Sequence, residues 1–333
     1  MLGTIEKNQD ALIQQILADM VPDYLDRSTR YIEKSLRDIR YSLLFTLEGL
    51  KHEKPSIIKA YFSWLAVALH HAGIDKAVAG QLYVLIQTRL APHLSLEQRT
   101  LLDAIDPNTF SVDENGVSYV TKPDTATYLR YVLNKDRHAA RAHILKLRET
   151  GSSLKDIYLD ILQPSLYEVG RLWQTGTIHV ADEHLATVIT QSIMANFYEE
   201  IFASPKHGKK LLSTAIGTEL HEIGIRMVTD FFELDGFQTH YLGANMPPDE
   251  IVRFAESFQP DLVCLSVTLP LHLSALQETL DKLRERLPGG APKILIGGQA
   301  FSGDESLYNR FGADGHARNA ASALEVGRHL VGL

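Results

Sequence analysis

The stretch KLLSTAIGTELHEIGIRMV, residues 210–228, decides the fold of the C-terminal part of the chain. Residues 210–217 form the short, mostly apolar run that is typical of a buried strand, and a helical pattern starts near residue 221. Glu219, His221 and Gly224 lie at the junction between the two. A helix start that happens to carry a histidine explains this cluster, and so does a ligand for a metal centre.

Three further apolar runs, at 237–243, 261–267 and 293–298, have the length of strands. Helical patterns begin near residues 221, 248, 271 and 304, and a last helix is expected at about 319–331. Strands that alternate with helices predict a parallel sheet covered on both faces. Residues 206–333 are therefore expected to form a flavodoxin-like α/β domain of about five strands, with ligand at the carboxyl ends of the first and third strands.

The rest of the chain is predicted to be helical. Residues 1–115 carry apolar residues at helical spacing, with breaks at Pro22, Pro55 and Pro92 and expected N-caps at Asp26 and Ser95. A turn-rich linker is expected at 106–124.

Four more helices are predicted in residues 116–205, near 124–134, 137–150, 153–173 and 181–202. Their short connections favour a four-helix bundle. Pro164 predicts a kink in the third of these helices.

Composition narrows the functional classes. The net charge of −8 argues against a general nucleic-acid binder, which needs a basic face. Cys264 is the one cysteine and lies in a predicted strand, so the sequence excludes a disulfide framework and favours a reducing compartment. The first residues lack a signal pattern, and the apolar runs are shorter than about 18 residues. We expect a cytoplasmic protein that does not span a membrane.

Three loops at the ligand edge of the predicted sheet are small, polar or rich in glycine. Beyond the first loop, they contribute Ser266, Thr268, Gly297 and Gly298. Adjacent glycines let a flat ligand approach the backbone. A carboxylate such as Glu219 commonly orients a metal-bound histidine through its second ring nitrogen. No neighbouring cluster completes a metal site made by protein alone, so a metal held by His221 would bring its other ligands.

The run ELHEIG, together with Ser266 and Gly297–Gly298, resembles the cobalamin-binding domain that corrinoid methyltransferases, mutases and light sensors share. That family's usual pattern is Asp-x-His-x-x-Gly, and Glu219 in place of the Asp is characteristic of its photoreceptor branch. LGANMPPDEIV, residues 242–252, resembles the family's second strand-to-helix turn. The resemblance covers residues 124–333. It implies that His221 is the lower cobalt ligand and that the nucleotide tail lies near Ser266, Gly297 and Gly298.

A second motif, WQTGTIHVADEH at residues 173–184, lies in the predicted bundle. Core packing of a tryptophan and capping of a helix explain its parts separately. Together, Trp173, Glu183 and His184 resemble the Trp-x9-Glu-His motif of CarH-type adenosylcobalamin-dependent photoreceptors. In that family the motif covers the upper face of the cofactor, where an indole supplies an apolar lid and a carboxylate can accept bonds from ribose hydroxyls. The constellation therefore favours an adenosyl group over a methyl group.

The resemblance implies a photochemical mechanism. Light breaks the cobalt–carbon bond, the bundle shifts, and subunit contacts change, so a light-dependent homo-oligomer and a downstream protein partner are expected. Gln174 occupies the position at which CarH-type proteins can carry a histidine that binds cobalt after light. A bis-histidine product through that position is in doubt, and His179, His184 or water could take its place.

CarH-type repressors carry a basic winged-helix domain before the bundle, and residues 1–115 lack its pattern. Residues 1–120 hold 12 Lys and Arg against 15 Asp and Glu, a net charge of −3, so no direct nucleic-acid binding is expected. This region instead resembles a globin-like sensor module, and the architecture is compatible with the photocobilin subgroup, which also binds biliverdin. The candidate residues for that second, non-covalent chromophore are Arg30, Arg37, Arg40, Tyr41, His70 and His71. A solvated helix face and ordinary core or surface histidines explain the same residues.

The sequence thus predicts a non-enzymatic adenosylcobalamin photoreceptor, with biliverdin as a possible second chromophore. The alternative is a corrinoid carrier protein of a cobalamin-dependent methyltransferase, which shares the bundle and the sheet. Trp173, Glu183 and Glu219 favour the photoreceptor. A mutase subunit is a weaker third interpretation because the chain shows no substrate barrel.

Overall fold

A computed structural model of the chain describes residues 2–110, 118–288, 292–302 and 306–333. The chain divides into two compact units. One comprises Met1–Gly116 with Gln174–Thr177, and the other comprises Val117–Trp173 with Ile178–Leu333. The boundary expected between residues 115 and 116 lies outside the described residues.

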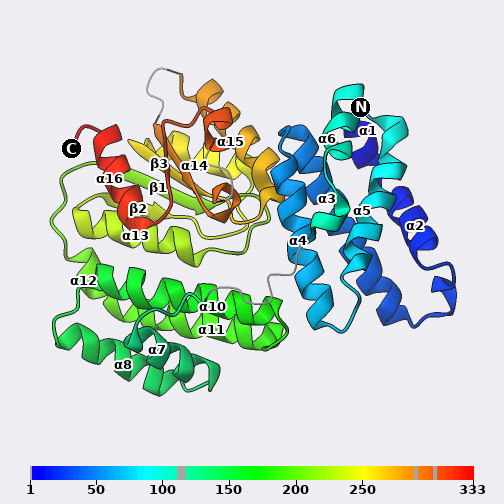
Figure 1. The fold of residues 1–333 in the computed structure, drawn as a ribbon. Helices are drawn as coiled ribbons and strands as arrows, with labels where there is room; N and C mark the ends of the chain where they lie inside the picture. Colours follow the sequence, from blue (N-terminus) through cyan, green and yellow to red (C-terminus); the bar gives the residue numbers. More distant parts are fainter. Residues whose placement is uncertain (1, 111–117, 289–291, 303–305) are drawn as a thin grey trace. The chain divides into compact units, whose positions relative to one another are not determined.

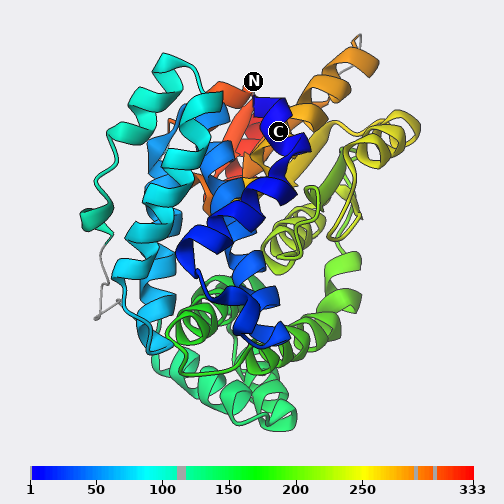
Figure 2. The ribbon, with the colours of Figure 1, turned by 90° about the vertical axis from the view of Figure 1, so that its right-hand side faces the viewer.

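The N-terminal unit is helical in its described part, as predicted. Its helices are α1 (Leu2–Lys7), α2 (Gln9–Met20), α3 (Thr29–Lys51), α4 (Pro55–His71), α5 (Ala77–Leu90) and α6 (Leu96–Asp103). Three short 3₁₀ turns accompany them, at Tyr24–Asp26, Ala91–His93 and Pro107–Thr109. Helices α2 to α5 pack against one another, and Figure 2 shows them in dark blue to cyan.

The starts of these helices follow local chemistry. Pro55 occupies the first turn of α4, where a missing N–H costs nothing. Ser95 caps α6 through a capping box with Gln98, as expected. The cap predicted at Asp26 was wrong: Asp26 ends a 3₁₀ turn, and the hydroxyl of Ser28 caps α3 by accepting the N–H of Tyr31 at 3.3 Å.

The second unit begins with the predicted four-helix bundle. It consists of α7 (Pro123–Leu133), α8 (Arg137–Glu149), a long third helix, and α11 (Val180–Met194), which continues through the 3₁₀ turn Ala195–Phe197 into α12 (Tyr198–Phe202). The third helix comprises α9 (Leu154–Asp156), a π-helical stretch (Ile157–Leu162) and α10 (Gln163–Gln174).

The irregularity of the third helix lies just before Pro164. Proline has no N–H to give to the carbonyl four residues earlier, which belongs to Asp160. The hydroxyl of Thr125, itself fully buried, donates to that carbonyl at 2.7 Å. A distortion was predicted here, and it takes the form of π-helical hydrogen bonding between Ile157 and Leu162.

The C-terminal sheet has five parallel strands in the order β2-β1-β3-β4-β5, the predicted flavodoxin-like arrangement. The strands are β1 (Lys210–Ala215), β2 (Gln238–Tyr241), β3 (Leu262–Ser266), β4 (Lys293–Gly297) and β5 (Gly315–Ala317). Four helices cover the sheet: α13 (Ile223–Asp235), α14 (Pro248–Phe258), α15 (Leu273–Arg286) and α16 (Ala320–Leu330). Figure 1 shows α13 and α16 on one face and α14 and α15 on the other.

The helix predicted to start near residue 304 was wrong in its described part. Residues 303–305 lie outside the described residues, and the next described element is only a 3₁₀ turn, Tyr308–Phe311. Gly312 ends this turn in the left-handed region, at φ 62°, and leaves two residues before β5.

Helix α13 belongs to two cores at once. Phe232 packs with Leu211 and Leu262 of the sheet, whereas Phe231 packs with the bundle. Ile223 and Met227 share the bundle core with Phe231. Three residues of α13 spaced four apart are therefore buried against the bundle, and the bundle and the sheet form one unit.

Among the helices of the described ranges, none combines the length and the apolar character that crossing a membrane requires.

Candidate functional site

The site predicted at the end of β1 is organised around the carboxylate of Glu219, which is 1% exposed. Its Oε1 accepts the backbone N–H groups of Leu220 and His221, both at 3.1 Å, and lies 2.5 Å from Nδ1 of His221. Its Oε2 accepts the N–H groups of Thr268 at 3.0 Å and Leu269 at 2.9 Å. Glu219 therefore ties the loop after β1 to the loop after β3.

The loop after β2 joins the same cluster through the backbone. The N–H of Asn245 donates to the carbonyl of Glu219 at 2.9 Å, and the N–H of Gly217 donates to the carbonyl of Met246 at 3.1 Å. Three strand-end loops thus meet beside His221, at the carboxyl edge where parallel sheets bind ligands.

The paired side chains shift each other's titration. Burial acts to raise the pKa of Glu219, but the hydrogen bond and charge of His221, with the backbone donors, lower it to about 2. The hydrogen bond to Glu219 raises the pKa of His221, burial opposes this, and the charges of Glu219 and Glu183 add to it. The carboxylate is thus ionised and fixes Nδ1 as the protonated ring nitrogen.

The other side of the imidazole is accessible. The side chain of His221 is 57% exposed although its carboxylate partner is buried, and the neighbouring Leu220 is 74% exposed. A Cβ added at Gly224 would meet no atom within 4 Å. With Nδ1 held by Glu219, Nε2 remains to bind a metal.

The remaining predicted residues on the sheet have structural reasons of their own. Ser266 ends β3 and is buried, and the backbone of Thr268 serves Glu219. A Cβ at Gly297 would lie 2.7 Å from the carbonyl oxygen of Ala317. Gly298 has φ 108°, and a Cβ there would collide with the carbonyl oxygen of Val267. The fold alone requires glycine at both positions, so close approach of a ligand is not needed to explain them.

The predicted upper-face residues lie on the bundle. Trp173 is 39% exposed near the end of α10. Glu183 and His184 lie in the first turn or two of α11, in contact with each other, and the side chain of His184 is 74% exposed. His179 is the N-cap residue of α11, and its backbone N–H donates to the carboxylate of Asp182 at 3.0 Å.

Bundle and sheet loop are linked at this site. The charge of Glu183, on α11 of the bundle, acts to raise the pKa of His221. Nε2 of Gln191, on α11, donates to Oε1 of Glu222 at 2.6 Å. Gln191 and Glu222 were not predicted from the sequence, because a contact between two helices leaves no local pattern in either.

The residues proposed for a second chromophore are exposed on two helices of the N-terminal unit. Arg30, Arg37 and Tyr41 lie on α3, and Arg40 on α3 pairs with Asp10 at 2.7 Å. His70 and His71 end α4 and contact each other edge to face, with ring centroids 5.4 Å apart.

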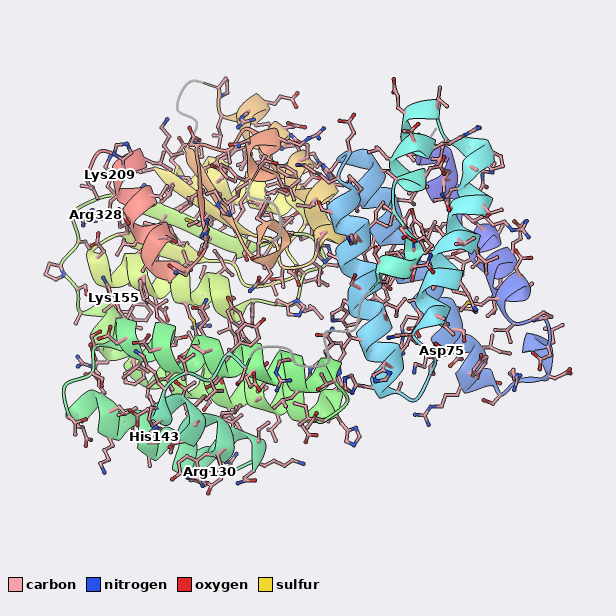
Figure 3. The ribbon with its side chains drawn as sticks, viewed as in Figure 1. Asp75, Arg130, His143, Lys155, Lys209 and Arg328 are labelled. Carbon is pink, nitrogen blue, oxygen red and sulfur yellow. The ribbon has the colours of Figure 1, made fainter. Side chains whose placement is uncertain are left out.

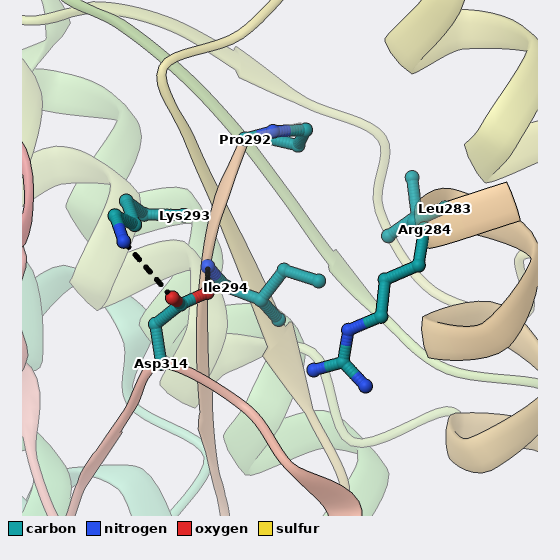
Figure 4. A pocket seen from close by; sticks show the side chains of 6 residues that line it. All are labelled: Leu283, Arg284, Pro292, Lys293, Ile294 and Asp314. Atoms are coloured by element: carbon teal, nitrogen blue, oxygen red, sulfur yellow. Dashed lines mark hydrogen bonds and ion pairs between the residues drawn. The ribbon is translucent and has the colours of Figure 1, made fainter. Parts of the chain in front are cut away.

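A small cavity of about 190 Å³ lies at the opposite edge of the sheet, where β4 begins. Figure 4 shows its lining by Leu283, Arg284, Pro292, Lys293, Ile294 and Asp314, with Lys293 and Asp314 paired at 3.2 Å. None of the residues predicted to bind a ligand lines it. In the described ranges, His, Cys, Asp and Glu form no group of three that could hold a metal ion, so His221 would serve a metal that carries further ligands.

Two segments of the chain match models of the B12 binding domain: residues 125–197, in the bundle, and residues 209–325, in the sheet. The chain therefore carries cobalamin-binding domains in the part that holds the site.

Several curated proteins are similar over the same part. The HTH-type transcriptional repressor CarH of Myxococcus xanthus is 29% identical over 153 residues, which is 45% of this chain and 50% of CarH. Dimethylamine corrinoid protein 1 of Methanosarcina acetivorans and dimethylamine corrinoid protein 3 of Methanosarcina mazei are each 26% identical over half of this chain and over 75% and 95% of their own lengths. The chain thus spans about half the length of CarH and most of the two corrinoid proteins.

The fold has a solved counterpart. The monomethylamine corrinoid protein of Methanosarcina barkeri superposes with a TM-score of 0.55 at 21% identity, over 61% of this chain and 96% of that protein. This likeness establishes the shared fold.

Proposed function

We propose that this chain is a light sensor that binds adenosylcobalamin between its bundle and its sheet. The observation that carries the proposal is the pair Glu219–His221: a buried carboxylate holds Nδ1 at 2.5 Å, and the exposed ring leaves Nε2 for cobalt. The matching B12 binding domains and the similarity to CarH support it.

In this proposal, each residue around His221 has a separate role. Glu219 keeps the proton on Nδ1, so that the lone pair of Nε2 points away from the carboxylate. Leu220 and Gly224 provide an apolar, open surface beside the ring. Thr268 and Leu269 hold Glu219 in place through their backbone N–H groups.

The bundle covers the opposite face. Trp173 supplies a broad apolar surface, and Glu183 supplies a carboxylate that can accept hydrogen bonds from ribose hydroxyls. Bound adenosylcobalamin would supply a cobalt–carbon bond that visible light breaks. Trp173 and Glu183 would hold the adenosyl group in the intact cofactor, and without that group the two residues would no longer fix the position of the bundle.

A corrinoid carrier for a methyltransferase is the second candidate, because the dimethylamine corrinoid proteins are matched over 75% and 95% of their lengths. The carboxylate of Glu183, paired with the exposed His184, favours the light sensor, since a methyl group offers no hydroxyl to a carboxylate. The net charge of −3 in residues 1–120 favours a protein partner over nucleic acid. Biliverdin in the N-terminal unit completes the proposal.

The test is the visible spectrum of the full chain reconstituted with adenosylcobalamin or methylcobalamin, before and after illumination. We expect tighter binding of adenosylcobalamin, an irreversible spectral change in light, and a change in size on gel filtration. His221→Ala should alter the part of the bound cobalamin spectrum that reports the lower ligand. His329 is an exposed histidine near the end of α16, and His329→Ala should leave that spectrum unchanged. A light-inert complex that prefers methylcobalamin would establish the carrier instead.

A further inference from the structure

Three charged residues of alternating sign lie four apart at the start and along one face of α13: Glu222, Arg226 and Asp230. A spacing of four places side chains on the same face of a helix. Each of the three contacts a different part of the bundle. We call this set the seam residues.

Glu222 is the first of them and is adjacent to His221 in sequence. Its Oε1 accepts from Gln191 of α11 at 2.6 Å, and its Oε2 accepts from the hydroxyl of Tyr241, at the end of β2, at 2.8 Å. One carboxylate, next in sequence to the proposed cobalt ligand, therefore joins the bundle to the sheet.

Arg226 makes the second contact through aromatic rings. Its Cζ lies 4.8 Å from the ring centroid of Tyr198, in α12, and 5.3 Å from that of Tyr241. Nε of Arg226 is buried and has no hydrogen-bond partner among the described residues. A buried donor without a hydrogen-bond partner costs free energy, so Arg226 is only partly satisfied in this arrangement.

Asp230 makes the third contact. The buried hydroxyl of Tyr158, in the π-helical stretch, donates to its Oδ2 at 2.9 Å. Burial raises the pKa of Asp230 to about 6, although Tyr158 and Arg226 act to lower it and Glu233 adds to the rise. Beside it, the ammonium of Lys155 lies 5.4 Å from the ring centroid of Phe231, and Figure 3 labels Lys155 near α13.

We propose that the seam residues pass a change at His221 to the bundle, and this proposal rests on the proposed function. Glu222 follows His221 directly, and its partner Gln191 is on the same helix as Glu183. A displacement of the His221 loop therefore acts on α11, which carries part of the opposite face. Polar contacts specify one alignment of bundle and sheet, so a shift of the His221 loop is transmitted through them.

The experiment compares variants that remove single seam contacts from the full chain. Gln191→Leu removes the donor to Glu222, and Tyr158→Phe removes the donor to Asp230. Tyr128→Phe is the matched control, because Tyr128 is equally buried and its hydroxyl bonds Thr190 at 2.9 Å within the bundle. Hydrogen exchange of peptides from α11, α12 and 157–162 is measured without cofactor, with aquocobalamin, and with adenosylcobalamin before and after light.

In the wild type and in Tyr128→Phe, we expect binding of aquocobalamin to change exchange in these bundle peptides. In Gln191→Leu and Tyr158→Phe, the spectrum of His221-bound cobalamin should persist while that change falls about tenfold. Bundle peptides that respond equally in all four proteins would overturn the coupling role and leave the proposed function intact. A wild type that binds no cobalamin would overturn the proposed function and the coupling with it.

Discussion

At the scale of single residues, Glu219 serves five donors with two oxygens. Four of them are backbone N–H groups from two loops, and the fifth is the ring of His221. A buried carboxylate is stable only when it is satisfied in this way. The same residue therefore holds the loops together and orients the proposed cobalt ligand, so its structural and functional roles cannot be separated by position alone.

Glu219→Gln tests this double role. At pH 7 we expect the free energy of unfolding to fall by about 2–3 kcal/mol, because the ionised form is favoured in the fold. The pKa of Glu219 is lowered from 4.5 to about 2, so its contribution is complete above about pH 4.5 and is lost as pH falls through 2. Urea unfolding of the chain without cofactor at pH 7 and at lower pH measures the difference, which should shrink with acidity.

The contribution of His221 to the free energy of unfolding depends on pH in the opposite direction. Its raised pKa stabilises the pair below about pH 6.5, and this part is lost as pH rises through the folded-state pKa. Equal stability of Glu219→Gln and wild type at pH 7 would show that the five hydrogen bonds are not what holds these loops.

Sequence reasoning placed Glu219 and His221 at the correct edge of the sheet, because strand ends and helix starts are marked locally. It did not place Thr268 and Leu269 against Glu219, since backbone donors carry no residue identity. The pairing of Gln191 with Glu222 was equally invisible: both side chains are ordinary surface types until the fold brings α11 to α13.

At the scale of elements, two glycines differ in why glycine is present: the fold requires one, and a ligand would explain the other. Gly298 follows β4 with φ 108° and has no room for a Cβ beside Val267, whereas Gly224 lies in the first turn of α13 with open space around it. The first glycine is demanded by the protein's own backbone. The second is not, and in a helix alanine is the better residue.

Gly298→Ala should therefore destabilise the chain by about 1–3 kcal/mol, through its left-handed conformation and its collision with Val267. Gly224→Ala should leave stability unchanged or raise it by about 0.5–1 kcal/mol. The same change should weaken cobalamin binding, because its methyl group enters the surface beside His221. Thermal unfolding without cofactor and a spectral titration with aquocobalamin measure the two effects. Full cobalamin affinity in Gly224→Ala would contradict a cofactor lying against this turn.

Elements with strong local patterns were predicted correctly, among them the four bundle helices and the four longer strands. The weakly marked ones were not. The three residues of β5, Gly315–Ala317, lack an apolar run and form a strand by pairing with Leu295–Gly297. The helix expected near 304 is, in its described part, only the 3₁₀ turn Tyr308–Phe311, which ends at Gly312 in the left-handed region.

At the scale of the whole molecule, the matched B12 binding domains account for residues 125–197 and 209–325, and residues 1–124 lie outside both matches. The N-terminal unit has its own core, with Phe62, Tyr83 and Phe110 in mutual ring contact. It is therefore more than a linker. Two cofactors in one chain would let one unit report on the state of the other.

The proposal of biliverdin in this unit makes a prediction about the arginines of α3. Arg40 is paired with Asp10. Of the three arginines, we therefore expect Arg30 and Arg37 to bind the propionate groups of biliverdin. The full chain mixed with biliverdin should gain a far-red band. The double variant Arg30→Ala, Arg37→Ala should bind biliverdin about tenfold more weakly, as expected for losing charge-assisted hydrogen bonds, with the cobalamin spectrum unchanged. Arg40→Ala is the matched control and should keep wild-type affinity. A chain that gains no band, or a double variant that binds as the wild type does, would mean that this basic row is a solvated face.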